Sequence, residues 1–407
     1  MRIAITSNGP GEFAGWVRPL VAALYRHAPA TDVTLFFVPD DYATGREPDV
    51  ARALFPNVRV VSAKTYLRFA LGARVDGVPD RVDVVQYLGG DLMHAARVHK
   101  RLGGRASTYK FARRRDTKTF AHAYALDDAN ARAIARDGYP RDRVTVVGNL
   151  AIDGALAEAG ADYGDATDRV PDDGVLVMPG TRKHEVANLI PFFVQTALRL
   201  RATRPEIPVA FAVSPFTTED ELARAFANGG HRNVWGATGT IVRDERGLAL
   251  APADGSRPFP VVRDAMRYAR RARFVVTLPG TKCIELAALG VPAIVCVPLN
   301  APEAVVINGP LQYLDRVPFA GTLLKRAMVV AVDRRFTLTA QPNIDTGDVI
   351  MPELRGTLMP AEVARRIAAY YDDGAARAAA SARLLELYAA HAGAADRMAR
   401  SLLADGT

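Results

Sequence analysis

Apolar and polar positions follow two recurring patterns along the chain. Short apolar runs, such as residues 2–7 and 274–278, are typical of buried strands. Between such runs lie longer stretches with apolar residues three and four positions apart, such as 92–102, which predict amphipathic helices. Strands that alternate with helices predict parallel sheets joined by right-handed crossovers. We therefore expect an α/β fold.

In the first half the apolar runs predict strands at 2–7, 32–38, 58–61, 82–88, 105–108, 123–126 and 143–147. The clearest helices there are predicted at 15–27, 92–102 and 128–137. The stretch 157–174 is rich in Ala, Asp and Gly and has little apolar periodicity, so it reads as a linker.

After the linker the alternation resumes. Strands are predicted at 174–178, 209–214, 274–278 and 293–297, helices at 186–201, 219–227, 261–271 and 282–289, and a hairpin around 240–251. Because 407 residues exceed one compact core, we expect two Rossmann-like doubly wound domains facing a cleft. The predicted boundaries are 1–157 for the N-terminal domain, 158–173 for the linker, 174–358 for the C-terminal domain and 359–407 for Ala/Arg-rich helices.

Composition narrows the classes of protein that fit. With 49% hydrophobic and 24% charged residues, the chain is neither disordered nor fibrous. Its net charge of +8 favours anionic partners, but the arginines are scattered over helices, so nucleic acid is not expected. The densest basic run, 113–115 with Lys110 and Lys118, reads as a solvated loop or as a contact with phosphate or membrane. Two cysteines exclude a disulfide framework, and the first residues read as a strand, so a cytoplasmic protein is expected.

Two strand-to-helix turns carry the most specific chemistry. Residues 178–185 read Met-Pro-Gly-Thr-Arg-Lys-His-Glu, and residues 279–282 read Pro-Gly-Thr-Lys. A helix that begins at a glycine turn presents free N–H groups and a positive dipole end, which suits an anion. Together the turns predict a binding site for a nucleotide diphosphate, although exposed cations would give the same pattern. The predicted contacts are Gly180, Thr181, Arg182, Lys183, Gly280, Thr281 and Lys282.

Three acidic side chains are candidates for chemistry, and two of them have two interpretations. Glu285 lies one turn into the second helix, where it could accept hydrogen bonds from ribose hydroxyls or cap its own helix. Asp91 ends an apolar strand and could act as a general base, with His94 one turn further on, or as a helix N-cap. Glu12 is the second candidate base, in a glycine-rich loop. The histidine spacing predicts no metal site, and no cofactor is expected.

The chain resembles lipid-A-disaccharide synthase, a glycosyltransferase family with the GT-B fold. Residues 179–186 match the family's Pro-Gly-Ser-Arg-x-x-Glu-Val turn, 279–285 match its Ser-Gly-Thr-x-x-x-Glu helix start, and 342–354 match its Pro-Asn-x-x-x-Gly segment. The resemblance covers nearly the whole length. It implies that Arg182, Thr281, Glu285 and Asn343 handle a UDP-sugar and that Asp91 belongs to the acceptor side. It also implies that the last helices cross back or pair with a second subunit.

The first domain departs from the family pattern. The family's Gly-Glu-x-Ser-Gly-Asp loop reads Gly-Glu-Phe-Ala-Gly-Trp at residues 11–16, and its Gly-His pair reads Gly-Asn at 148–149. Gly11, Gly15 and Asn149 remain candidate substrate contacts. Because the losses fall on the acceptor side, we expect a divergent relative with an altered acceptor.

These features predict inverting transfer of a hexosyl group, of acylated glucosamine type, from a UDP-sugar to a lipid-linked or phosphorylated sugar. A homodimer and a peripheral membrane contact at 310–324 are also expected, the latter stretch reading alternatively as an amphipathic core helix. Two other functions fit the same residues. One is a UDP-sugar 2-epimerase, which needs no acceptor, and the other is a non-catalytic nucleotide-sugar-binding protein.

Overall fold

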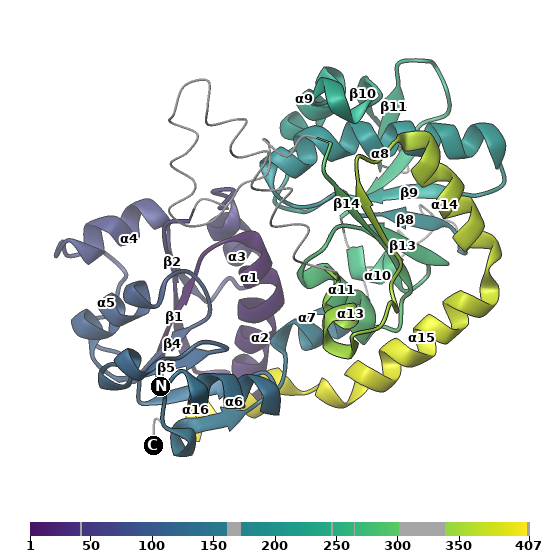
Figure 1. The fold of residues 1–407 in the computed structure, drawn as a ribbon. Helices are drawn as coiled ribbons and strands as arrows, with labels where there is room; N and C mark the ends of the chain where they lie inside the picture. The colour runs from purple at the N-terminus through teal and green to yellow at the C-terminus, as the bar shows by residue number, and fades with distance from the viewer. Residues whose placement is uncertain (41–42, 161–171, 246, 264, 301–337, 405–407) are drawn as a thin grey trace, which may run out of the picture. The chain divides into compact units, whose positions relative to one another are not determined.

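The computed structural model describes residues 1–40, 43–160, 172–245, 247–263, 265–300 and 338–404. The chain forms two compact units. The first consists of Met1–Ala157 with Tyr388–Thr407, and the second of Glu158–Leu387. Each unit has an α/β sheet of its own (Figure 1), which confirms the predicted pair of Rossmann-like doubly wound domains.

The first unit is built on a parallel sheet with the strand order β3-β2-β1-β4-β5-β6-β7. Its strands are β1 (Arg2–Ser7), β2 (Asp32–Phe37), β3 (Arg59–Val61), β4 (Val84–Tyr87), β5 (Arg105–Tyr109), β6 (His122–Ala125) and β7 (Val144–Val146). The chain starts at β1, winds outward to β3, then crosses to β4 and continues to β7. The strand order therefore reverses between β1 and β4, where open α/β sheets bind ligands at their carboxyl edge.

Helices follow most of these strands. They are α1 (Pro10–Glu12), the π-helix η1 (Phe13–Val17), α2 (Arg18–His27), α3 (Glu47–Leu54), α4 (Ala63–Ala70), α5 (Leu92–Leu102), α6 (Asp128–Arg136) and α7 (Leu150–Gly160). Short 3-10 turns lie at Arg114–Lys118 and Arg141–Arg143. Because α7 runs to Gly160, the first residues of the predicted linker are helical, and 161–171 lie outside the described residues.

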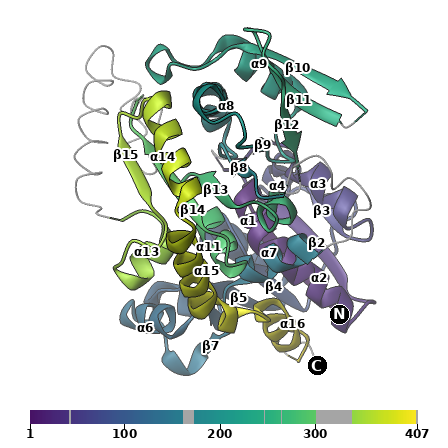
Figure 2. The same ribbon diagram turned by 90° about the vertical axis from the view of Figure 1, so that its right-hand side faces the viewer.

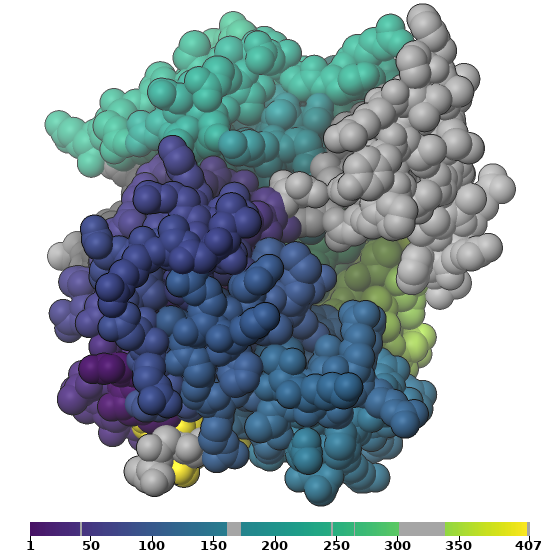
Figure 3. All heavy atoms as spheres, turned by 90° about the vertical axis from the view of Figure 1, so that its left-hand side faces the viewer, coloured from purple at the N-terminus to yellow at the C-terminus, as the bar shows by residue number. Residues whose placement is uncertain are grey.

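The end of the chain returns to the first unit. Helix α16 (Ala394–Ala404) packs against α2, and its Met398 and Leu402 are buried. In Figure 3 the yellow C-terminal residues emerge beside the purple N-terminal ones. Of the two arrangements that the resemblance implied for the last helices, the described chain has α16 folded onto its own first unit.

The second unit has the sheet order β10-β11-β12-β9-β8-β13-β14-β15. Its strands are β8 (Val175–Val177), β9 (Val209–Ala212), β10 (Gly239–Asp244), β11 (Gly247–Pro252), β12 (Phe259–Val262), β13 (Phe274–Thr277), β14 (Ala293–Pro298) and β15 (Glu353–Gly356). β10, β11 and β12 pair antiparallel, as the predicted hairpin requires, and the other pairs are parallel. Here the order reverses between β8 and β13.

The predicted helix at 261–271 is wrong in its first part. Val261 and Val262 belong to β12, where they pair with Phe211 and Ala212 of β9. Of the described residues in this range, only those of α10 (Ala265–Ala269) are helical. Both valines are buried and β-branched, which favours a strand over a helix once a neighbouring strand is available. Tertiary pairing therefore overrides the local helical pattern.

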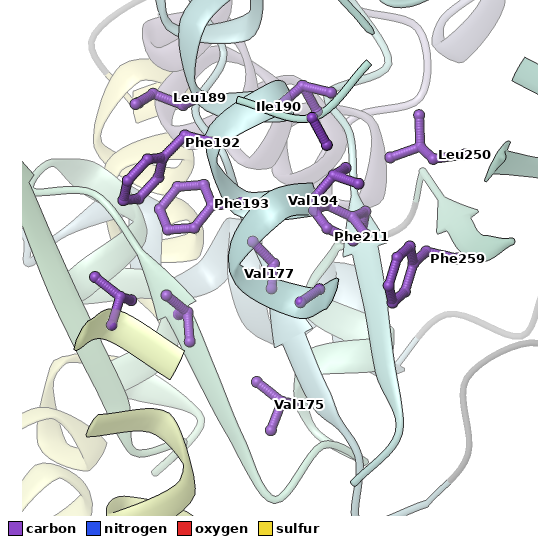
Figure 4. Packing of buried hydrophobic residues seen from close by; sticks show 14 of the residues in the cluster. Val175, Val177, Leu189, Ile190, Phe192, Phe193, Val194, Phe211, Leu250 and Phe259 are labelled. Carbon is purple, nitrogen blue, oxygen red and sulfur yellow. The ribbon is translucent and has the colours of Figure 1, made fainter. Parts of the chain in front are cut away.

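Helices cover the second sheet and close its core. They are α8 (Lys183–Thr203), α9 (Glu219–Asn228), α11 (Thr281–Ala288), α13 (Gln341–Thr346), α14 (Pro360–Asp372) and α15 (Gly374–Tyr388). α8 and α14 pack against each other, and Figure 2 shows both beside the strands. Phe192 and Phe193 of α8 belong to the same buried cluster as the strand residues Val177 and Phe211 (Figure 4). No helix in the described ranges is long and apolar enough to cross a membrane.

Candidate functional site

The two predicted glycine turns lie next to each other in the second unit. β8 pairs in parallel with β13, with Val177 opposite Val276, so both strands end at the same edge of the sheet. Gly180 follows the first strand and Gly280 the second, and both have positive φ, 102° and 146°. The turns therefore flank the point where the strand order reverses, which is where such sheets bind ligands.

At the first turn, after β8, the Glu185 carboxylate binds the backbone N–H groups that an anionic ligand would use. Glu185 Oε2 accepts hydrogen bonds from the backbone N–H groups of Thr181 and Arg182, at 2.9 and 3.0 Å. Its Oε1 lies 3.7 Å from the Arg182 guanidinium. A Cβ at Gly180 would lie 2.4 Å from Glu185 Oε2, so the glycine lets the carboxylate approach the turn. The predicted anion-binding N–H groups of this turn are thus already occupied.

The second turn is different. Helix α11 begins at Thr281 with Gly280 as its N-cap, and no side chain caps it within the described part of the chain. Gly280 is exposed, and nothing lies within 4 Å of the position of a Cβ there. Because the first N–H groups of a helix have no partner within it, this turn offers donors and a positive dipole end. It is the more open of the two predicted anion sites.

Lys282 and Glu285 form an ion pair on the first turns of α11. The Glu285 side chain is only 7% exposed, whereas that of Lys282 is 30% exposed. A buried carboxylate needs a cation or a hydrogen-bond donor beside it, and Lys282 supplies one. Neither of the two predicted roles of Glu285, ribose contact or helix cap, involves the lysine.

Lys183 points to another helix. Its Nζ lies 3.7 Å from Glu221 Oε1 near the start of α9. Glu221 is the second half of a capping box with Thr218. The side chain of Lys183 is 67% exposed, so this is a surface ion pair of small energetic value.

Asn343 organises a loop. Its Nδ2 donates to Met351 O and Glu353 Oε1, at 2.7 and 2.9 Å, and its Oδ1 accepts from the N–H groups of Ile350 and Met351. The residue is fully buried. An amide side chain has two donors and two acceptor positions, and all four are used here. The sugar-nucleotide contact predicted for Asn343 is therefore not supported by its geometry.

In the first unit, the loop after β1 continues directly into helix. Gly11 and Glu12 lie in α1, and Gly15 is buried within the π-helix Phe13–Val17. A π-turn within a helix is rare and occurs often at functional sites. A Cβ at Gly154 of α7 would lie 3.2 Å from Ala14 O, so α7 packs closely on this segment.

Asp91 and His94 follow β4, but their side chains make different contacts. Asp91 is exposed and is the N-cap of α5, because its Oδ1 accepts from Met93 N at 2.8 Å. His94 Nδ1 lies 2.8 Å from the Tyr66 hydroxyl of α4, and the two rings meet edge to face. Burial lowers the pKa of His94, while Asp91 acts in the opposite direction. The alternative N-cap role of Asp91 is thus present, and His94 has a partner on α4.

Asn149 starts the helix after β7. Its Oδ1 accepts from Ala151 N at 3.1 Å, in the manner of an N-cap. The neighbouring Gly148 carbonyl accepts from the buried Tyr109 hydroxyl at 3.1 Å, and Leu150 N donates to the same hydroxyl at 2.9 Å. Burial raises the pKa of Tyr109. These hydrogen bonds fix the backbone between β7 and α7.

Lys110 of the first unit is a site candidate that the sequence pattern does not identify. Lys110 follows β5 with a φ of 71°, and its ammonium lies over the rings of Trp16 and Phe111. In the sequence Lys110 is only one of several cations near the basic run at 113–115. Neither a positive φ nor a contact with Trp16, almost a hundred positions earlier, has a local sequence signal.

Among the described residues there is neither a metal-binding cluster nor a reactive thiol. In the ranges that the structure describes, no group of three or more His, Cys, Asp or Glu side chains is arranged to hold a metal ion. Cys283 and Cys296 are buried free thiols, and burial raises their pKa to about 12. Both thiols therefore stay protonated at neutral pH, where the thiolate would be the reactive form.

Two Rossmann-like units, with a pair of glycine turns at the strand-order reversal of the second, define a fold of the GT-B-like class. No protein-family model and no curated protein matches the chain. Among solved structures, it is similar to a candidate UDP-N-acetylglucosamine 2-epimerase from Listeria monocytogenes, with a TM-score of 0.58 and 14% identity over 98% of this chain and 94% of the other.

The chain is also similar to the UDP-GlcNAc 2-epimerase from Neisseria meningitidis, whose structure was solved with bound UDP-GlcNAc. The TM-score is 0.55 and the identity 9%, over 99% of this chain and 100% of that one. At these identities the likeness establishes the shared fold.

The comparisons correct the family predicted from the sequence. These two structural neighbours are UDP-GlcNAc 2-epimerases, not lipid-A-disaccharide synthases, so the expected family is wrong. The same finding overturns the expected glycosyltransferase activity, and with it lipid A biosynthesis and transfer to a lipid-linked or phosphorylated sugar. The two families share a GT-B-like architecture, which explains how the matching turns led to the wrong one.

Proposed function

We propose that this protein binds a UDP-sugar at the carboxyl edge of its second sheet and epimerises the sugar at C2. The observation that carries the proposal is the pair of glycine turns, at Gly180 and Gly280, beside the strand-order reversal between β8 and β13. The likeness in fold to UDP-GlcNAc 2-epimerases supports the sugar class.

In this proposal the diphosphate lies at the open turn before α11. The N–H groups of Thr281 and Lys282 and the positive end of the helix dipole offset its charge. Arg182 contributes a cation from the neighbouring turn, where Glu185 holds its backbone in place. The expectation that no metal or other cofactor is needed remains a prediction.

Inversion at C2 has a defined chemical requirement. The C2–H bond must break with its electron pair forming a C1–C2 double bond as UDP leaves C1. A proton must then return to the opposite face of C2 as UDP adds back to C1, so a base and an acid are both needed. The predicted catalytic residues Asp91, His94 and Glu12 remain the candidates for these roles. Because the returning proton comes from a group that exchanges with water, solvent hydrogen enters the product at C2.

The test uses the whole chain with UDP-GlcNAc in deuterium oxide. We expect UDP-ManNAc as the product, with deuterium at C2 detected by mass spectrometry and proton NMR. Arg182→Met removes the cation that this proposal places beside the diphosphate and should weaken UDP binding about tenfold, as expected for one lost charge-assisted contact of about 1.4 kcal/mol. Lys183→Met is the matched control, because Lys183 pairs with Glu221.

The outcomes separate the remaining functions. UDP binding without deuterium at C2, over a panel of UDP-sugars, would favour the non-catalytic nucleotide-sugar-binding protein. Absence of UDP binding would refute the proposal as a whole. The cytoplasmic location, the homodimer and the peripheral membrane contact remain predictions, and residues 310–324, on which the contact is predicted, lie outside the described residues.

A further inference from the structure

Three unusual backbone features meet at one edge of the first sheet. The π-helix Phe13–Val17 follows β1, the positive-φ glycines Gly89 and Gly90 follow β4, and the left-handed Lys110 follows β5. The strands β1, β4 and β5 are neighbours in the sheet and run parallel. All three features therefore gather at the carboxyl ends of adjacent strands, beside the strand-order reversal.

Lys110 is held in a costly conformation. A left-handed backbone costs a residue with a Cβ roughly 1–2 kcal/mol. Here Lys110 N donates to Tyr124 O at 2.8 Å, and Asn130 Nδ2 donates to Lys110 O at 3.0 Å. Such strain persists where the surroundings fix it, and it is enriched at functional sites.

The side chain of Lys110 is placed as precisely as its backbone. Its ammonium lies 5.7 Å from the centre of the Trp16 ring and 5.4 Å from that of Phe111. Trp16 in turn packs edge to face on the buried Tyr109. Burial lowers the pKa of Lys110, and nearby Glu12 partly offsets this. The ammonium therefore lies beside two aromatic rings, and the residue is partly buried.

Two carboxylates lie at the same edge. Burial raises the pKa of Tyr87, and the charges of Glu12 and Asp91 act in the same direction. The Tyr87 hydroxyl donates to Gly90 O at 2.8 Å, which ties it to the loop after β4. A Cβ at Gly89 would come within 3.2 Å of Glu12 Cβ, so the two loops are in contact.

Unsatisfied polar atoms accompany these charges. Among the described residues, Ser7 Oγ at the end of β1 and Asn8 Oδ1 directly after it are buried without a hydrogen-bond partner. A buried polar atom without a partner costs about 1–3 kcal/mol, so these two oxygens are available as acceptors for a ligand hydroxyl. A Cβ at Gly89 would lie 2.3 Å from Asn8 Oδ1, so a larger residue there would cover this oxygen.

The charged groups at this edge of the first sheet indicate which class of ligand fits there. One ammonium and two carboxylates nearly balance, which disfavours a ligand with a large net charge of either sign. Carboxylate, amide and ammonium groups bind hydroxyls well, and Trp16 and Phe111 add apolar surface next to them. We propose that Lys110, Glu12 and Asp91 form a sugar-recognition site in the first unit for a hexose-type ring, with Lys110 the residue that determines its affinity. The proposal takes its sugar class from the proposed function.

The sequence supplies a built-in reporter for the test. The chain has two tryptophans, so Trp235→Phe leaves Trp16, beside Lys110, as the single one. In this background we would titrate N-acetylglucosamine, UDP-GlcNAc and UDP and follow the tryptophan emission. The two sugar-bearing ligands should change the emission, and UDP alone should not.

Lys110→Met in the same background should weaken the apparent affinity for N-acetylglucosamine about tenfold, and Glu12→Gln should weaken it as well. Lys118→Met, an exposed lysine after the same strand, is the matched control and should leave the affinity unchanged. Lys110→Arg keeps the charge and tests the site if the methionine variant unfolds, which circular dichroism would detect. It should retain part of the affinity.

Three results would overturn the inference. These are an unchanged sugar affinity in a folded Lys110 variant, the same response to UDP alone as to UDP-GlcNAc, and no response to either sugar ligand. Calorimetric binding of UDP to the same proteins is measured in parallel. It tests the nucleotide site of the second unit separately, so failure of the sugar site and failure of the proposed function are distinguishable.

Discussion

One buried amide and one buried carboxylate hold the segment around α13 together. The Glu353 carboxylate accepts from Thr339 N, Thr339 Oγ1, Ala340 N and Asn343 Nδ2. Burial alone would raise the pKa of Glu353, but these hydrogen bonds outweigh it and lower the pKa. The carboxylate therefore stays ionised, and Asn343 links it to the backbone of Met351.

Replacing Asn343 by Ala should destabilise the second unit without touching the nucleotide site directly. The change leaves two backbone N–H groups and the Met351 carbonyl without partners in a buried place. We expect the free energy of unfolding to fall by about 3 kcal/mol. Urea unfolding followed by circular dichroism measures this. Ile344→Ala, a change at the next, exposed position of α13, is the control and should cost much less. Equal losses would show that the hydrogen bonds of Asn343 contribute little.

Among the elements, the strand-to-helix turn before α8 makes the sharpest demand on its sequence. Gly180→Ala would place a Cβ 2.4 Å from Glu185 Oε2, at a residue whose φ is 102°. The carboxylate must then leave the N–H groups of Thr181 and Arg182. We expect a loss of stability above the roughly 1–2 kcal/mol of backbone strain alone, and weaker UDP binding because Arg182 moves.

Gly255→Ala is the matched control for this turn. Gly255 also has a positive φ, 77°, but nothing lies within 4 Å of the position of its Cβ. The control therefore carries the strain without the collision. Calorimetry of unfolding and of UDP binding compares the two variants. If both lose the same stability and keep the same UDP affinity, the contact between Gly180 and Glu185 is not important.

The strands and helices that the sequence predicts well are those with a strong local pattern. β1 is observed at Arg2–Ser7 and α5 at Leu92–Leu102, as predicted, because apolar spacing and an Asp N-cap determine them locally. β12 is an exception, because its strand conformation depends on pairing with β9, which is distant in the sequence. Local pattern identifies an element best when no partner strand competes for it.

The same limit applies to the candidate sites. The Pro-Gly turns at 179–180 and 279–280 are visible in the sequence, and the structure brings them together as neighbours of β8 and β13. That Glu185 occupies the first turn depends on a side-chain rotamer, which the sequence does not determine. The position of Lys110 depends on Tyr124 and Asn130, which hold its backbone from a different strand and helix.

At the scale of the whole molecule, helix α16 brings the described chain back to the first unit. Asp153 of α7 anchors its start, accepting from the N–H groups of Gly393 and Ala395 at 2.6 and 2.5 Å. Arg397 adds a bond from Nε to Val147 O at 2.7 Å. Burial raises the pKa of Asp153, while the two N–H donors and Arg397 act against it. Asp153 is thus an N-cap supplied from another helix.

Asp153→Ala should loosen this attachment. Removing an N-cap typically costs about 1–2 kcal/mol, and here two buried N–H groups lose their acceptor together. Asp153→Asn keeps one carbonyl acceptor and should cost less. Asp396→Ala is the control: its ion pairs with Arg26 and His27 lie at the surface and contribute only about 0.5 kcal/mol. Limited proteolysis, with the cleavage sites identified by mass spectrometry, should show early cuts before α16 in Asp153→Ala alone. Equal protection of all three variants would mean that the apolar face of α16, with Met398 and Leu402, holds the helix without its cap.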